Sequence, residues 1–185
     1  RPLAMAADSV ADSQSLVLLD KDDLIGPIAP ASDRDYLPAP PTPKAFADCC
    51  NEFWWVCPYV AKGLWRGEIL YAKQCMDHYV RNELMKMLTW YAGAKTSFSR
   101  SPGKSGKYLQ AMLESALWEM LLATFADASI ECTWQSLAVA CDLFRLAGVQ
   151  VGEHFGYDYP HEDDRRVSAH LVHVRNLPPD AKEIY

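Results

Sequence analysis

The sequence has no long hydrophobic run, and its apolar stretches are short and interrupted by charged residues. A membrane-spanning helix needs about 20 consecutive, mostly apolar residues, so we expect no transmembrane segment. Half of the 185 residues are nevertheless hydrophobic, which excludes a disordered chain and supplies one domain with a substantial core. The chain also lacks an initiator methionine, a basic leader and a signal-like segment. It begins Arg1-Pro2-Leu3, and we therefore expect it to be part of a longer protein.

The six cysteines form no pattern typical of a metal site or a disulfide framework. No Cys-x-x-Cys motif occurs, and no cysteine and histidine have zinc-finger spacing. We therefore predict no metal ligands in this chain. The thiols are expected to serve as small apolar side chains in a reducing cytoplasm. The cysteines are Cys49, Cys50, Cys57, Cys75, Cys132 and Cys141.

Charge is distributed unevenly along the chain. The net charge is −6, but residues 62–107 carry nine cations and three acids, so this block is +6 and the remainder is −12. A basic centre in an acidic chain suits an anionic ligand beside a cationic one. Duplex nucleic acid fits poorly because most of the surface would repel phosphate, and we predict no nucleic-acid partner. The alternative is a set of solvated helix faces without a ligand.

The first 42 residues differ in composition from the rest. Residues 16–19 and 24–25 are typical of two short strands joined by a polar turn. Prolines then predict an extended linker. We place a domain border here. Residues 1–42 are expected to be a short extended or β remnant of another domain plus a Pro-rich linker, and residues 43–185 a helical domain.

Hydrophobic spacing after this border predicts an all-α domain. Thr42 and Pro43 are typical of a helix start, because Thr caps free N–H groups and Pro suits the first helical position. Apolar residues repeat at the spacing of a bundle seam, so we predict an up-and-down helical bundle. The expected helices cover residues 43–66, 68–92, 107–113, 115–125, 130–155 and 163–176.

The helix expected over residues 46–66 has two distinct faces. One is an apolar stripe that must pack on a neighbour: Phe46, Cys49, Cys50, Phe53, Cys57, Val60 and Leu64. The other carries Glu52, Trp55, Tyr59, Lys62 and Arg66. A face that meets only water rarely places two aromatic rings between a carboxylate and two cations. It can stack on a ring and clamp an anion. The alternative is a second buried interface whose charged ends reach solvent.

Two pairs of cations are candidate phosphate contacts. Lys62 and Arg66 are one helical turn apart and point the same way, so they can grip a triphosphate together. Lys104 and Lys107 lie in a Ser- and Gly-rich loop, where they can act as point charges. This loop lacks the earlier glycine and the preceding strand of a Walker motif. The alternatives are ion pairs with nearby acids and a solvated basic loop.

Two features near the C-terminus have weaker interpretations. Arg165 and His170 have the Arg-x4–6-His spacing of HEPN-type ribonucleases, a pattern that is common by chance. Glu162-Asp163-Asp164 begins the last expected helix, where acids suit the helix dipole and can also hold a polycation. We assign no catalytic residue.

Several segments of the chain share a further pattern. They are Phe46-x-Asp48-Cys-Cys-Asn-Glu-Phe-Trp54, Tyr59-Val-x-Lys62-Gly-Leu-x-Arg66-x-Glu68-Ile-Leu, Arg81-x-Glu83-Leu-x-Lys-Met, Gly103-Lys104-x-x-Lys107-Tyr-Leu and Tyr159-Pro160. Spread over roughly residues 16–160, they resemble the helical half of the aminoglycoside 6-adenylyltransferases, which modify streptomycin.

The resemblance implies a nucleotidyltransferase of two domains. The first is a mixed sheet with a Gly-Ser motif and acidic residues that hold Mg²⁺, where two metal ions activate the drug hydroxyl and stabilise the leaving pyrophosphate. The second is a helical bundle that closes the cleft. This sequence has no Gly-Ser followed by Asp-x-Asp, so it contains no assignable metal carboxylates. We therefore expect the N-terminal domain as a partner within the same protein, and an inactive chain without it.

The complete protein would transfer AMP from ATP to a hydroxyl of an aminoglycoside such as streptomycin and so confer antibiotic resistance. In that setting Lys62, Arg66, Lys104 and Lys107 are the expected contacts to the ATP phosphates. The expected drug contacts are Glu52, for its cationic groups, and Trp55 and Tyr59, for stacking on its sugars. The alternative is a non-catalytic, HEPN-like helical module that binds a nucleotide, a drug or another protein.

Overall fold

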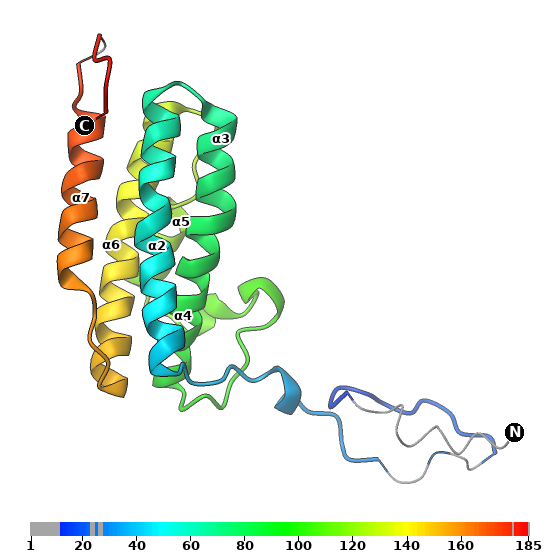
Figure 1. Cartoon of the computed structure of the whole chain (residues 1–185). Coiled ribbons are helices and arrows are strands. Elements are labelled where there is room, and N and C mark those ends of the chain that lie inside the picture. The colour runs from blue at the N-terminus through cyan, green and yellow to red at the C-terminus, as the bar shows by residue number, and fades with distance from the viewer. Residues whose placement is uncertain (1–11, 23–24, 26–27, 179, 185) are drawn as a thin grey trace, which may run out of the picture.

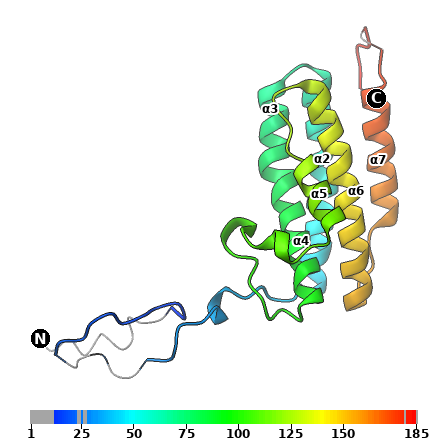
Figure 2. The same ribbon diagram turned by 180° about the vertical axis from the view of Figure 1, so that it is seen from behind.

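The computed structural model describes residues 12–22, 25, 28–178 and 180–184. Within these residues it contains helices and no strand, which confirms the predicted all-α class. Figures 1 and 2 show the long helices packed side by side and running alternately up and down, while the N-terminal segment extends away from one end of the bundle. No helix in the described part is long and apolar enough to cross a membrane.

The helical elements follow one another with short connections. Three are 3₁₀ turns, namely η1 (Arg34–Tyr36), η3 (Lys104–Gly106) and η4 (Leu109–Ala111). The α-helices are α2 (Pro43–Trp65), α3 (Ile69–Gln74), α4 (Arg81–Lys95), α5 (Ser115–Ala123), α6 (Ile130–Phe155) and α7 (His161–Arg175), and the π-helical segment η2 (Cys75–Val80) joins α3 to α4.

Helix α2 begins where the sequence predicts. The Thr42 hydroxyl accepts a hydrogen bond from the Ala45 N–H at 3.1 Å, which satisfies one of the free donors of the first turn. The helix then runs unbroken through Pro58 to Trp65. All seven residues of its predicted apolar stripe are at most 2% exposed. The stripe therefore forms one wall of the core, as expected from its spacing.

Helix α6 supplies the opposite wall. The Ser129 hydroxyl caps its start by accepting from the Cys132 N–H at 3.3 Å, and Gly156, at a φ of 72°, ends it in the left-handed conformation. Phe53 of α2 and Phe144 of α6 stack with their ring centroids 3.7 Å apart. This contact joins the two longest helices at the centre of the core.

Two local predictions are wrong. Residues 16–19 form no strand, and the leucines there are 70–89% exposed, because no second strand among the described residues pairs with their backbone. Of the second expected strand, Leu24 lies outside the described residues. Residues 107–113 form no α-helix either, since the preceding loop has φ values of 57° at Ser105 and 77° at Gly106 and leaves room for one 3₁₀ turn.

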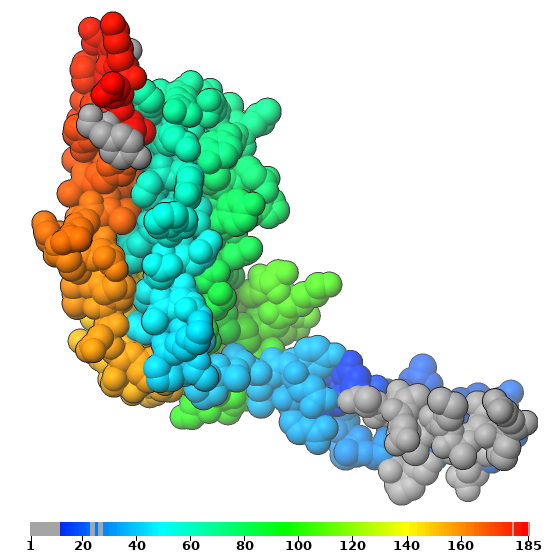
Figure 3. All heavy atoms as spheres, viewed as in Figure 1, coloured from blue at the N-terminus to red at the C-terminus, as the bar shows by residue number. Residues whose placement is uncertain are grey.

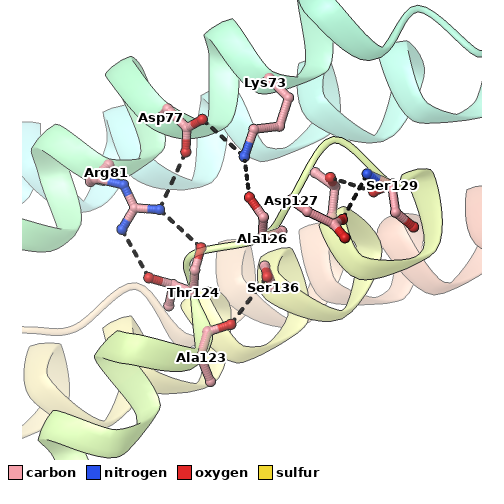
Figure 4. Close-up of polar contacts among 10 residues, drawn as sticks. Lys73, Asp77, Arg81, Ala123, Thr124, Ala126, Asp127, Ser129 and Ser136 are labelled. Atoms are coloured by element: carbon pink, nitrogen blue, oxygen red, sulfur yellow. Dashed lines mark hydrogen bonds and ion pairs between the residues drawn. The ribbon is translucent and has the colours of Figure 1, made fainter.

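A buried polar cluster holds the α5–α6 connection against the π-helical segment (Figure 4). The guanidinium of Arg81 donates to the side-chain and backbone oxygens of Thr124, each at 2.9 Å, and lies 3.8 Å from the centroid of the Phe125 ring. Lys73 donates to the Ala126 carbonyl at 3.0 Å, and Asp77 pairs with both cations. The Arg81 side chain is only 12% exposed, so these bonds are shielded from water.

Replacing this arginine tests how much the cluster stabilises the bundle. We expect Arg81→Met to lower the free energy of unfolding by about 2–3 kcal/mol, because buried Thr124 loses both charged donors. Urea denaturation followed by circular dichroism measures the change. Arg165→Met is the control, since its partner Glu162 is exposed and keeps Arg166. Equal losses in the two variants would contradict a stabilising role for the cluster.

Candidate functional site

A cavity of about 460 Å³ lies between α2 and α7. The two helices are adjacent, and Figure 3 shows both on one face of the molecule, α2 in cyan and α7 in orange to red. Aromatic side chains of α2 and polar side chains of α7 make up most of the wall. The lining residues are Asn51, Trp54, Trp55, Pro58, Tyr59, Lys62, Asp163, Arg166, Val167, His170 and Ile184.

The structure brings three of the seven predicted site residues together in this cavity, namely Trp55, Tyr59 and Lys62. Glu52 and Arg66 are exposed on α2 but lie outside the lining. Lys104 and Lys107 are in the loop between α4 and α5, away from α7 (Figure 1). The cavity therefore separates residues that the sequence analysis had grouped by their chemistry alone, and the roles of all seven remain predictions.

Lys62 is a half-buried cation without a carboxylate partner in the described part of the chain. Its Nζ lies 5.1 Å from the ring centroid of Tyr59 and 5.9 Å from that of Tyr71. Aromatic rings attract an ammonium weakly and accept no conventional hydrogen bond from it, so its three N–H donors are left for an anion. Trp55, which is 63% exposed, meets the edge of Tyr59 with 6.3 Å between ring centroids.

Helix α7 contributes side chains that the sequence analysis did not assign to this site. Asp163, Arg166 and His170 recur at three- and four-residue intervals and so lie on one face of the helix. The spacing in the sequence indicates that the three side chains share a helix face, but it does not indicate that this face lies against α2. Asp163 had been considered only with the helix dipole or a polycation, and His170 only as part of a ribonuclease pair.

The three consecutive acids at the start of α7 have different partners. Glu162 is paired with Arg165 and Arg166 at 2.7 Å each, and these arginines lower the pKa of its carboxyl to about 2. Asp164 is buried and accepts two bonds from Arg145, at 2.6 and 2.7 Å. The side chain of Asp163 makes no hydrogen bond or ion pair with any other described residue, and Asp163 is the one of the three that lines the cavity.

Asp164 holds α7 in place beside the cavity. Besides the two bonds from Arg145 of α6, it accepts from the Tyr159 hydroxyl at 3.0 Å. The Tyr159 ring packs on Gly148, where an added Cβ would lie 2.8 Å from it. Burial raises the pKa of Tyr159 and the carboxylate of Asp164 adds to the rise, so the phenol stays protonated and donates.

The ribonuclease pair is not assembled in this structure. Arg165 and His170 are five residues apart on α7, which turns their side chains about 140° away from each other around the helix axis. Arg165 is engaged with Glu162, while His170 faces the cavity. The geometry therefore favours the α2–α7 cavity over a site built on this pair.

Comparison with known proteins gives the family. A family model described as streptomycin adenylyltransferase matches residues 2–174. The chain belongs to the streptomycin adenylyltransferase family. It is 38% identical over 165 residues to an aminoglycoside 6-adenylyltransferase of Bacillus subtilis (strain 168), covering 88% of this chain and 58% of the relative. It is 40% identical over 152 residues to one of Staphylococcus aureus, covering 81% and 54%.

A solved structure supports the same assignment at the level of the fold. The chain resembles the crystal structure of an aminoglycoside 6-adenyltransferase from Bacillus subtilis with a TM-score of 0.69 and 35% identity, over 78% of this chain and 55% of that one. This member of the streptomycin adenylyltransferase family therefore spans a little over half the length of the relatives that it matches.

The docking of α7 can be tested through its buried acid. We expect Asp164→Asn to lower the free energy of unfolding by about 2–3 kcal/mol, because it leaves Arg145 without its main counter-charge. This loss of stability is smaller than for breaking a fully buried ion pair. The Arg145 side chain is 36% exposed, so water can solvate its charge when the partner is removed. Thermal and urea unfolding measure it. An unchanged midpoint would show that this pair does not hold α7.

The histidine in the cavity gives a prediction for pH. Burial lowers the pKa of His170, and the nearby His173 adds to this. The unfolded chain then binds the proton more readily than the folded one, so this group reduces stability as the pH falls below about 6.5. We expect His170→Gln to lose less stability than the wild type between pH 7.5 and pH 5. Urea denaturation at the two pH values measures these losses. If the free energy of unfolding falls by the same amount in the wild type and in His170→Gln, the prediction is contradicted.

Proposed function

We propose that this chain is the helical half of an aminoglycoside adenylyltransferase, which transfers AMP from ATP to a drug hydroxyl and thereby confers antibiotic resistance. The observation that carries the proposal is the family match over residues 2–174, together with a cavity lined by Trp55, Tyr59 and Lys62. The Lys62 ammonium has no carboxylate partner among the described residues. The named relatives are aminoglycoside 6-adenylyltransferases, which supports the same class of reaction for this protein. Streptomycin is the drug that we propose.

We assign the metal-dependent step of the transfer to another domain of the protein. Residues 1–42 are proposed to be the end of the nucleotidyltransferase domain and its linker, and residues 43–185 the substrate-binding domain. The cavity does not fit Mg²⁺, because its single carboxylate, Asp163, shares the wall with Lys62 and Arg166, whereas Mg²⁺ prefers several oxygen ligands. We therefore place Mg²⁺ in the N-terminal domain and expect the isolated chain to be inactive.

The chain's own residues would bind and orient the substrates. The ammonium of Lys62 would donate to ATP phosphate oxygens, and the rings of Trp55 and Tyr59 would stack on a sugar or base. In the transfer, the drug hydroxyl oxygen bonds to the α-phosphorus, the bond to pyrophosphate breaks, and the hydroxyl proton passes to a base in the other domain. Arg66, Lys104, Lys107 and Glu52 would act from outside the cavity.

The cellular setting follows from the thiols. All six cysteines are free and five are buried, as small apolar side chains in the core. We propose a cytoplasmic location, since a reducing compartment keeps such thiols unpaired. The alternative function is a non-catalytic module that binds a nucleotide, a drug or a protein. One observation favours it: this chain, which spans about half the length of its relatives, forms the cavity from its own residues.

Lys62 provides the test of the proposed function. The chain would be joined to an intact nucleotidyltransferase domain of a relative, and Mg²⁺-dependent AMP transfer to streptomycin would be followed by mass spectrometry. We expect Lys62→Ala to raise KM for ATP or lower kcat by about 10–100-fold, the equivalent of one charged hydrogen bond of about 1.5–3 kcal/mol.

Lys44→Ala is the matched control, because Lys44 lies on the same helix but is exposed, pairs with Asp48 and is outside the cavity. Unchanged kinetics in Lys62→Ala would remove Lys62 from the site. Binding of ATP or streptomycin to a joined protein that shows no transfer at all would favour the non-catalytic module.

A further inference from the structure

We infer that Asp163 binds a guanidinium or ammonium group of the drug, so that the cavity has a cation-binding end at Asp163 and an anion-binding end at Lys62. The inference rests on the proposed function and adds to it the carboxylate that the drug would use. Asp163 lies within the cavity lining, whereas Glu52, the carboxylate expected from the sequence, lies outside it.

The carboxylate of Asp163 is not engaged by the protein's described residues. Its two neighbours, Glu162 and Asp164, are both engaged with arginines, at 2.6–2.9 Å. Asp163 has no partner among the described residues and lies on the cavity wall. Arg166, which also lines the cavity, is hydrogen-bonded to Glu162 and not to Asp163. One carboxylate is thus available to a ligand.

The parallel direction of α2 and α7 separates Asp163 from Lys62. α2 and α7 run the same way, each starting at the end of the bundle nearer the N-terminal segment (Figure 1). Asp163 is in the first turn of α7, whereas Lys62 is in the last turn of α2. The lining of α2 extends from Asn51 to Lys62, a rise of about 16 Å at 1.5 Å per residue. The two charges therefore lie toward opposite ends of the cavity.

Aromatic rings lie between the two charges. Trp55 and Tyr59 occupy the intervening turns of α2, with Trp55 largely exposed. A guanidinium is planar, so it can donate two hydrogen bonds to a carboxylate while its face stacks on an aromatic ring. The streptidine ring of streptomycin carries two such groups, and ATP carries the opposite charge. Because Asp163 and Lys62 lie toward opposite ends of the cavity, the drug cation would bind away from the like charge of Lys62. The phosphates of ATP would bind away from the like charge of Asp163.

Binding to the joined protein, in which the chain is linked to the nucleotidyltransferase domain of a relative, tests this division. Streptomycin and ATP would be titrated separately into the joined wild type and into its Asp163→Asn and Lys62→Ala variants by isothermal calorimetry. We expect Asp163→Asn to weaken streptomycin binding at least tenfold and to leave ATP binding unchanged, and Lys62→Ala to do the reverse. Asp158→Asn is the matched control, because it removes the same charge from a nearby exposed position outside the cavity.

The possible outcomes are distinct. If the wild type binds both ligands and Asp163→Asn binds streptomycin as tightly as the wild type, this inference is overturned and the proposed function stands. The same holds if Asp158→Asn weakens streptomycin binding equally, since the effect is then one of net charge. A lowered melting temperature with normal streptomycin binding would limit Asp163 to the helix dipole. If the wild type binds neither ligand, the proposed function and this inference both fail.

Discussion

The candidate site depends on how α7 is held against the rest of the bundle. A single buried carboxylate, Asp164, receives two bonds from Arg145 and one from Tyr159. A carboxylate in such a place is costly unless all of its acceptor sites are used, and the Ser168 hydroxyl supplies a further donor at 3.0 Å. Because the bonds come from directions fixed by α6 and its following loop, they also set the rotation of α7. That rotation turns Asp163 and His170 toward α2.

Helix α2 serves both the core and the cavity, and its two roles are separated by face. The buried stripe packs on α6, with Phe53 stacked on Phe144. The outer face presents Trp55, Tyr59 and Lys62 to the space beside α7. Trp54 lies where the faces meet, since it is 2% exposed, lines the cavity and has the Arg145 guanidinium 5.8 Å from its ring. Core packing and the floor of the cavity are therefore parts of one assembly.

Local chemistry made much of the fold predictable. The caps at Thr42 and Ser129 and the apolar spacing of α2 and α6 correspond to features of the structure, because each depends on residues within a few positions of one another. The predictions of an N-terminal strand and of a helix over residues 107–113 were wrong because both structures depend on more than local spacing. A strand requires a distant partner for its backbone, and the second segment follows a loop whose positive φ values no apolar pattern reveals.

The sequence by itself determined the long helices of the bundle and which face of α2 is buried, because helical periodicity and capping act over one or two turns. It also identified the family through short runs of residues. Only the tertiary structure decided that α2 faces α7, about a hundred residues later, and which acid of Glu162-Asp163-Asp164 stays unpaired. The physical reason is that Glu162 finds Arg165 and Arg166 within one helical turn, whereas Asp164 is paired by Arg145 of another helix. No local pattern specifies where Arg145 lies relative to α7.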